Sequence, residues 1–297
     1  MVIPVSPILF MCLITNTKFD EKEFEIEREI VLNEIKRYDS RPAGILCRNI
    51  PKSLFGESDY GDPIGGYEET IKNIEKSDLE EFKQKYYVSN NMFVVVNGNI
   101  KEKHKQIIEK YFSKIEEGNP KKKKPTIGKG KDIEIKFPTK LVHCSLNFEA
   151  PLDLRYKLLT SIVGYRGLMN AIFREKYGIC YSCSFYIYNT YPDRLAISLE
   201  LPGIEKQKLD LVEIAKEEFF EKLKQLDEQE YKKAMEKFKL DFMTSKYNLY
   251  LKTKKDLIYI NYFGKPWESI YKELLNINYE ELKELTFKNG KKVIVSD

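Results

Sequence analysis

The chain has 297 residues, of which 42% are hydrophobic and 13% aromatic, and this composition excludes an intrinsically disordered protein. Its 50 Lys and Arg residues nearly balance 46 Asp and Glu residues, which leaves a formal net charge of +4. Because basic and acidic residues are mixed along the chain, we expect no nucleic-acid partner. The one basic run, KKKK at 121–124, is interpreted as part of a solvated linker.

The five cysteines indicate a reducing compartment, because an odd and scattered set is not a disulfide framework. We therefore expect a cytoplasmic protein. Two of them form a C-x-x-C in GICYSCSFYIY, which is interpreted as a strand whose residues three apart face opposite sides. They are expected to be buried thiols that do not share a metal. The cysteines are Cys12, Cys47, Cys144, Cys180 and Cys183.

The chain opens with an apolar stretch, MVIPVSPILFMCLIT. It lacks the basic segment and the small-residue cleavage site of a signal peptide, and it is too short to span a bilayer. Pro4 and Pro7 confine any helix to roughly residues 7–16. We expect this apolar helix to need a packing partner, and we expect no membrane partner.

The next stretch, FEIEREIVLNEIKRYD at 24–39, predicts a helix with Asp20 as its N-cap. Glu27 and Glu34 are seven residues apart, which is almost two turns, so their carboxylates point the same way beside an apolar stripe. The spacing alone is also what two solvated glutamates on an amphipathic helix would show. The two acids are thus candidates for a functional site. The flanking sequence must distinguish such a site from two solvated glutamates.

The rest of the first half alternates helical patterns with loops and a single predicted strand. A loop rich in Gly, Asp and Pro lies at 57–69, and a segment that combines charge, Pro and Gly at 116–132 is interpreted as an interdomain linker. Helices are predicted over 40–56, 70–87 in two pieces, and 101–115, and a strand followed by a turn over 91–100.

The second half predicts helices packed on a mainly antiparallel sheet, an α+β fold. We expect two related layered domains: residues 1–118, a linker at 119–131, and residues 132–297. Strands are predicted over 133–137, 140–150 and 291–297, with a strand pair over 179–203 around Pro192 and Asp193; helices are predicted over 153–164, 167–177, 206–226 and 227–264.

Three segments taken together resemble the pitrilysin-type metallopeptidases, the inverted zincins that include mitochondrial processing peptidase and insulin-degrading enzyme. They are FDEKEFEIEREIVLNEIKRYDSRP, the stretch from LFGESDYGDPIGGY to FVVVNGNI, and GLMNAIFREKYGICYSCSFY. The resemblance implies a zinc endopeptidase built from repeated α+β domains that enclose a chamber. In this family two histidines of an H-x-x-E-H helix hold the zinc, and the glutamate of that motif acts as the base.

The resemblance also implies roles for four residues of this chain. The family's third metal ligand, a glutamate on a later helix, matches Glu34 in VLNEI, and the acid that supports the metal site from seven residues earlier matches Glu27. An arginine and a tyrosine that bind the substrate backbone and the developing oxyanion match Arg174 and Tyr181 in REKYGICY.

The departure from the family is the missing H-x-x-E-H motif, so the first domain is expected to be truncated at its N-terminus. The chain has two histidines, His104 on a predicted helix and His143 on a predicted strand, and neither is interpreted as a ligand. Since a catalytic zinc takes three protein ligands, the isolated chain is expected to bind no zinc tightly and to be inactive.

Two explanations remain. In the first, the peptidase is split, and a partner polypeptide supplies H-x-x-E-H and shares Zn²⁺ with Glu34, forming a heterodimer or larger assembly that hydrolyses peptides. In the second, the chain is a non-catalytic subunit of a processing-peptidase-like heterodimer that binds peptides or acts as a scaffold. The presence of both acids together with the arginine and tyrosine favours the split enzyme. The sequence does not define which peptides it cleaves.

Overall fold

A computed structural model describes residues 14, 17–121, 123–163 and 167–297. Their contacts divide the chain into two compact units, each built from separate stretches of sequence. We call Met1–Ile35, Gly65–Lys124 and Ser245–Trp267 the helical unit, and Lys36–Ile64, Pro125–Thr244 and Glu268–Asp297 the sheet unit. The predicted division into 1–118, 119–131 and 132–297 stays a prediction.

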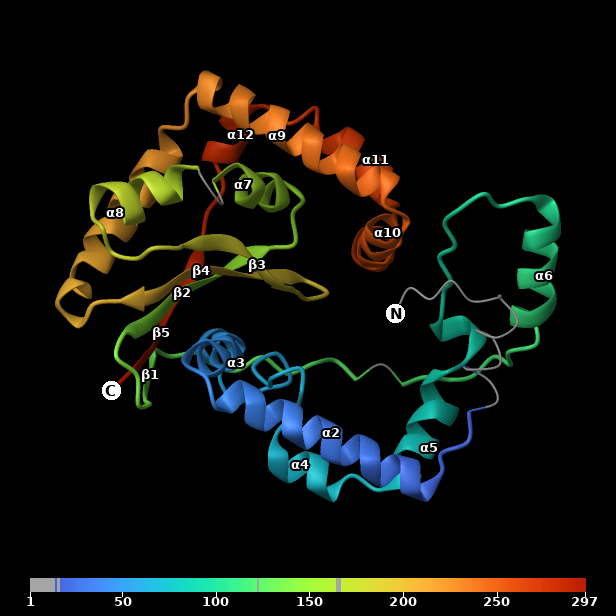
Figure 1. The fold of residues 1–297 in the computed structure, drawn as a ribbon. Coiled ribbons are helices and arrows are strands. Elements are labelled where there is room, and N and C mark those ends of the chain that lie inside the picture. Colours follow the sequence, from blue (N-terminus) through green and yellow to red (C-terminus); the bar gives the residue numbers. More distant parts are fainter. Residues whose placement is uncertain (1–13, 15–16, 122, 164–166) are drawn as a thin grey trace. The chain divides into compact units, whose positions relative to one another are not determined.

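The sheet unit confirms the α+β prediction with a five-stranded, mainly antiparallel sheet in the order β1-β5-β2-β4-β3 (Figure 1). Only β1 and β5 run parallel. The strand pair predicted around Pro192 and Asp193 is confirmed, since the Tyr191 N–H donates to the Arg194 carbonyl at 2.8 Å across the turn. The strands are β1 (Ile133–Lys136), β2 (Val142–Pro151), β3 (Ser184–Thr190), β4 (Arg194–Ile204) and β5 (Lys288–Ser296).

Helices cover both faces of this sheet (Figure 1). Successive side chains of β2 point to opposite faces, so this strand packs against helices on both sides. Helix α3 (Pro42–Phe55) lies on one face, where Asn147 of β2 donates a hydrogen bond to Ser53 at 3.2 Å. Helices α7 (Arg155–Val163) and α8 (Leu211–Lys224) lie on the opposite face. There the ring of Phe148 meets that of Phe220 edge-to-face, with 5.1 Å between centroids.

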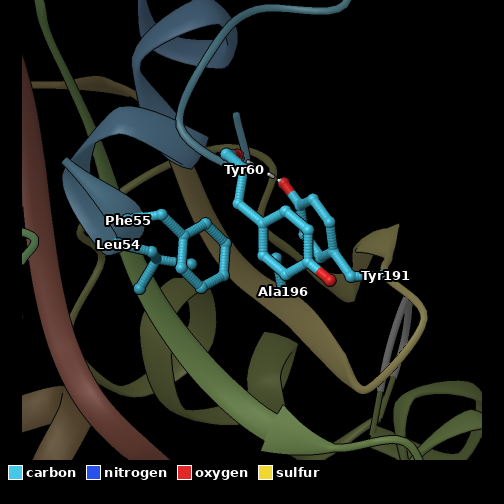
Figure 2. Close-up of a cluster of buried hydrophobic side chains, with 5 residues drawn as sticks. All are labelled: Leu54, Phe55, Tyr60, Tyr191 and Ala196. Atoms are coloured by element: carbon cyan, nitrogen blue, oxygen red, sulfur yellow. Dashed lines mark hydrogen bonds between the residues drawn. The ribbon is translucent and has the colours of Figure 1, made fainter. Parts of the chain in front are cut away.

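The C-terminal end of α3 packs against the β3–β4 turn through a cluster of buried, mainly aromatic side chains (Figure 2). The rings of Tyr60 and Tyr191 stack with their centroids 4.3 Å apart, and the Tyr191 hydroxyl donates to the Tyr60 carbonyl at 2.9 Å. Phe55 packs edge-to-face on both tyrosines. This cluster explains why the first part of the loop predicted at 57–69, residues 57–64, belongs to the sheet unit.

The last residues of the predicted linker pack closely against the same helix end. The Gly128 N–H donates to the Phe55 carbonyl at 2.8 Å. A Cβ at Gly130 would lie 2.1 Å from the Ser53 carbonyl oxygen and 2.2 Å from that of Leu54. Glycine is therefore required at 130 because no side chain fits between the two backbones. This part of the segment is held in place within the sheet unit.

Within the described ranges, the helical unit contains helices and irregular segments and no strand. The strand predicted within 91–100 is wrong, because none of the described residues forms a neighbouring strand with which this stretch could pair. The unit contains α4 (Glu68–Asn73), α5 (Lys76–Tyr86), α6 (Glu102–Phe112) and α10 (Leu249–Phe263). The helix expected over 7–16 lies, apart from Ile14, outside the described residues.

Two helices cross the boundary between the units, α2 (Glu21–Asp39) and α9 (Glu228–Tyr247). The single helical range predicted over 227–264 divides at Asn248, whose side chain accepts a hydrogen bond from the Leu251 N–H at 3.0 Å and caps α10. The chain continues through α11 (Trp267–Leu274) and α12 (Tyr279–Lys283). None of the helices in the described ranges combines the length and the apolar character that a bilayer span requires.

Candidate substrate-binding and metal-ligand residues

Arg174 and Tyr181 are placed by a helix end and the turn that follows it. Arg174 lies in the π-helical segment η2 (Asn170–Lys176), and Gly178 reverses the chain with a φ of +57°. The Gly178 N–H donates to the Arg174 carbonyl at 3.1 Å, and the Ile179 N–H donates to the Phe173 carbonyl at 2.8 Å. This reversal leads the chain back past Arg174, so the two side chains meet.

The two side chains form an exposed pair. The guanidinium carbon of Arg174 lies 4.6 Å from the centroid of the Tyr181 ring, a cation–π contact. Tyr181 is 81% exposed, although a tyrosine ring is usually at least partly covered. Neither side chain forms a hydrogen bond or an ion pair with any described residue. Their donors are therefore available to a ligand.

The C-x-x-C flanks Tyr181 and anchors it. Cys180 and Cys183 are buried, as predicted, but the predicted strand does not include them, because β3 begins at Ser184. The argument that they face opposite sides of a strand is therefore wrong. A hydrogen bond between the thiols raises the pKa of Cys180 and lowers the pKa of Cys183, and the nearby charge of Arg174 lowers the pKa of Cys183 further. Tyr181 is thus exposed between two buried anchors.

Glu27 and Glu34 lie on α2, as predicted, and both carboxylates are exposed. Neither has a hydrogen-bond or ion-pair partner among the described residues. The apolar stripe beside them is only partly covered, since Ile35 is buried while Ile30, between the two acids, is 47% exposed. A rigid helix therefore presents two unpaired carboxylates beside exposed apolar surface.

Of the four predicted residues, two are in contact with each other and the other two share a helix. Arg174 and Tyr181 are in contact within the sheet unit, whereas Glu27 and Glu34 belong to the part of α2 in the helical unit. Gly178, which makes the first pair possible, was missed by the sequence analysis. A glycine directly after a helix is the signal that could have found it.

The two histidines occupy their predicted helix and strand. The ring of His104 accepts a hydrogen bond through Nδ1 from the Lys101 N–H at 3.1 Å, which caps the start of α6. His143 lies on β2, where burial lowers its pKa and leaves its Nδ1 without a hydrogen-bond partner. The local fold accounts for His104 as a helix cap.

This chain by itself does not fit a catalytic zinc. Such a zinc takes three protein ligands, and the described residues contain no group of three His, Cys, Asp or Glu side chains that could hold an ion. Glu34 offers a single carboxylate. Further ligands would have to come from elsewhere.

Comparison with known families gives a match over residues 73–238, more than half of the chain, to the family described as the Peptidase M16 inactive domain. The chain belongs to the M16 peptidase family. The matched range contains Arg174 and Tyr181 but excludes Glu27 and Glu34. The predicted resemblance to pitrilysin-type peptidases is thereby confirmed.

Solved structures support the fold of this M16 chain. A peptidase M16 inactive domain from Pseudomonas fluorescens has a TM-score of 0.81 at 16% identity, covering 98% of this chain and 74% of its own. A protease from Helicobacter pylori has a TM-score of 0.76 at 17% identity, covering 94% and 73%. A chain of complex III2 from Candida albicans has a TM-score of 0.84 at 16% identity, covering 98% and 76%.

Curated relatives of this M16 chain carry peptidase names. The uncharacterized zinc protease of Rickettsia felis is 25% identical over 286 residues, which cover 91% of this chain and 68% of the relative. The uncharacterized zinc protease YmxG of Bacillus subtilis is 26% identical over 188 residues, covering 60% of this chain. The match spans only 45% of YmxG, so the activity of such a relative is not transferred directly.

Proposed function

We propose that this M16 chain is one part of a split zinc metalloendopeptidase that hydrolyses peptides. In this proposal it supplies Glu34 as a metal ligand, Glu27 as the acid that supports the site, and Arg174 and Tyr181 as substrate-binding residues. A partner polypeptide supplies H-x-x-E-H and shares Zn²⁺ with this chain. We place the assembly, a heterodimer or larger, in the cytoplasm.

The observation that carries the proposal is the exposed pair of Arg174 and Tyr181. Both side chains are exposed, and apart from their contact with each other neither forms a hydrogen bond or an ion pair with a described residue. The Arg174 guanidinium can donate to a carbonyl oxygen of a bound peptide, and the Tyr181 hydroxyl can donate to the oxygen that gains negative charge during hydrolysis. Such donors act most strongly once a bound peptide and a partner exclude water.

The exposed carboxylate of Glu34 supports the second half of the proposal. Because it has no partner among the described residues, it can join a coordination sphere without breaking an existing ion pair. Its position on a helix fixes the face from which the side chain extends. The names of the relatives as zinc proteases are consistent with this role.

The experiment is reconstitution with a polypeptide of the same organism that contains H-x-x-E-H. We expect the isolated chain to bind no stoichiometric zinc and to cleave no peptide, and the assembled complex to do both. Zinc is measured by atomic emission after gel filtration, and cleavage with a library of unstructured peptides. Tight stoichiometric zinc in the isolated chain, or a stable complex without activity, would contradict the proposal.

A second candidate is a non-catalytic subunit that holds peptides for an active partner. The description of the matched family as an inactive domain favours this function, since the match contains the Arg174 and Tyr181 pair but not the two acids. In that case Arg174→Ala would weaken peptide binding, whereas Glu34→Gln would change neither the zinc content nor the activity of the complex. The response to Glu34→Gln therefore separates the two candidates.

A further inference from the structure

Residues Phe93–Val96 form an apolar segment whose backbone is unpaired. No N–H or carbonyl group of these four residues forms a hydrogen bond with another described residue, although each could pair with a neighbouring strand. Phe93, Val94 and Val96 are 47%, 38% and 44% exposed. Aromatic and β-branched residues favour strands, so this composition conflicts with an isolated, solvated conformation.

The segment is nevertheless held at both ends within the helical unit. Before it, the Asn91 side chain donates to the Tyr86 carbonyl at 2.9 Å. After it, the Asn97 side chain donates to Thr253 and to Asp256 of α10, both at 3.1 Å. The apolar residues between Asn91 and Asn97 are therefore ordered in advance, which lowers the entropy that a partner must overcome.

The sequence around the segment lacks the features that protect solvated strand edges. Such edges usually carry charges or prolines, but the chain from Val88 to Ile100 contains neither, although 32% of all residues are charged. Phe93 and Val95 would share one face of a strand, and Val94 and Val96 the opposite face. Apolar residues on both faces are typical of a strand covered on both sides.

We propose that Phe93–Val96 is a docking strand that pairs with an apolar β-strand of the polypeptide bearing H-x-x-E-H. This inference rests on the proposed function and names the surface through which that partner binds. Strand addition satisfies the unpaired backbone groups and buries the exposed side chains in one step. The three solved chains compared above are longer than the part that this chain matches, which is 73% to 76% of each, so a segment that this chain lacks is present in all three.

The first test is photo-cross-linking in the native cell, with p-benzoyl-phenylalanine in place of Phe93. The matched control carries it in place of Phe82, which is 55% exposed on α5 of the same unit. We expect the probe at position 93 to cross-link to a predicted strand of a polypeptide that contains H-x-x-E-H. The probe at position 82 should not cross-link to that polypeptide. If that polypeptide is captured through Phe82 alone, the docking strand is overturned while the proposed function survives.

Other cross-links are equally decisive. Cross-linking of the probe at position 93 to a second copy of the chain overturns the docking strand, and so does the absence of any cross-linked product. Cross-linking of Phe93 to a strand of a polypeptide without H-x-x-E-H retains strand docking as a mechanism but overturns the partner assignment, and with it the support for the split enzyme.

The second test uses proline to remove single N–H donors from the reconstituted complex. Successive N–H groups of a strand point to opposite edges, so Val94→Pro and Val95→Pro each block one edge. We expect at least one variant to weaken association about tenfold or more, with Val94→Ile unchanged as the control. Since neither N–H is bonded to a residue that the structure describes, the melting temperature of the isolated chain should not change. Unchanged association in both variants, or unfolding of the isolated chain, overturns the docking strand.

Discussion

The guanidinium of Arg174 lies over the ring of Tyr181, 4.6 Å from its centroid, although both side chains are exposed to solvent. The contact depends on the backbone between them, where Gly178 takes a φ of +57° and Ile179 is buried. Two hydrogen-bond donors are thus fixed next to each other on the surface. This arrangement suits the recognition of a peptide's carbonyl oxygens.

In the reconstituted complex, Arg174→Ala and Tyr181→Phe should each lower turnover by about 10²- to 10³-fold, the usual cost of losing an oxyanion donor. Zinc content should stay unchanged, because neither residue is a proposed ligand. Steady-state kinetics and metal analysis on the same samples check this. Lys176→Ala is the control, since Lys176 lies on the same helix and pairs with Glu218 at 2.6 Å. Loss of zinc in either variant would assign the residue a different role.

Glu34→Gln should lower the zinc content of the complex and abolish its activity, because a neutral amide is a poor ligand for Zn²⁺. The isolated chain should keep its stability within about 0.5 kcal/mol, since the exposed carboxylate has no partner among the described residues. Glu29→Gln, on an exposed position of the same helix, is the matched control. Full activity and full zinc in Glu34→Gln would exclude Glu34 as a ligand.

Gly130→Ala should destabilise the chain by roughly 1–3 kcal/mol, because the added Cβ would lie 2.1 Å from the Ser53 carbonyl oxygen. Gly65→Ala is the control, since a Cβ there meets no atom within 4 Å. That substitution should be neutral or stabilising by roughly 0.4–1 kcal/mol. Urea denaturation of the two variants measures the difference, and equal stabilities would mean that residues 125–131 are not packed on α3.

Asp256→Asn should destabilise the chain at neutral pH by roughly 1–3 kcal/mol. Burial alone raises the pKa of Asp256, but hydrogen bonds from the Lys252 ammonium at 2.7 Å, the Trp267 N–H at 2.8 Å and Asn97 lower it below its usual 3.8. A carboxyl with a lowered pKa stabilises the folded state above its unfolded pKa, and this stabilisation is lost as the pH falls through the folded pKa.

The gap in unfolding free energy between wild type and Asp256→Asn should therefore be constant from neutral pH down to about pH 4 and should shrink below it. Urea denaturation at a series of pH values measures this gap. Asp210→Asn, at an exposed position without a side-chain cap bond, should show no such trend. A gap that persists unchanged in acid would mean that Asp256 is not ionised in the folded chain.

Much of the fold could be predicted from local pattern. The helix over 42–55, the strands of the sheet and the turn at Pro192 and Asp193 depend on side-chain periodicity and turn residues, which act between neighbours in sequence. The shared helix face made Glu27 and Glu34 candidates for a site, whereas Arg174 and Tyr181, and the roles of all four residues, came from the resemblance to pitrilysin-type metallopeptidases.

Tertiary structure decided what depends on contacts between distant segments. FVVV has the composition of a strand, yet a strand forms only where another strand supplies its hydrogen bonds, and none does so here. The C-x-x-C has the composition of a strand, yet it lies in the irregular segment before β3, which begins at Ser184. The sequence alone therefore determined most of the elements and the candidate groups of this M16 chain. Packing alone decided which of them are paired, because burial and hydrogen bonding depend on partners that the local pattern does not name.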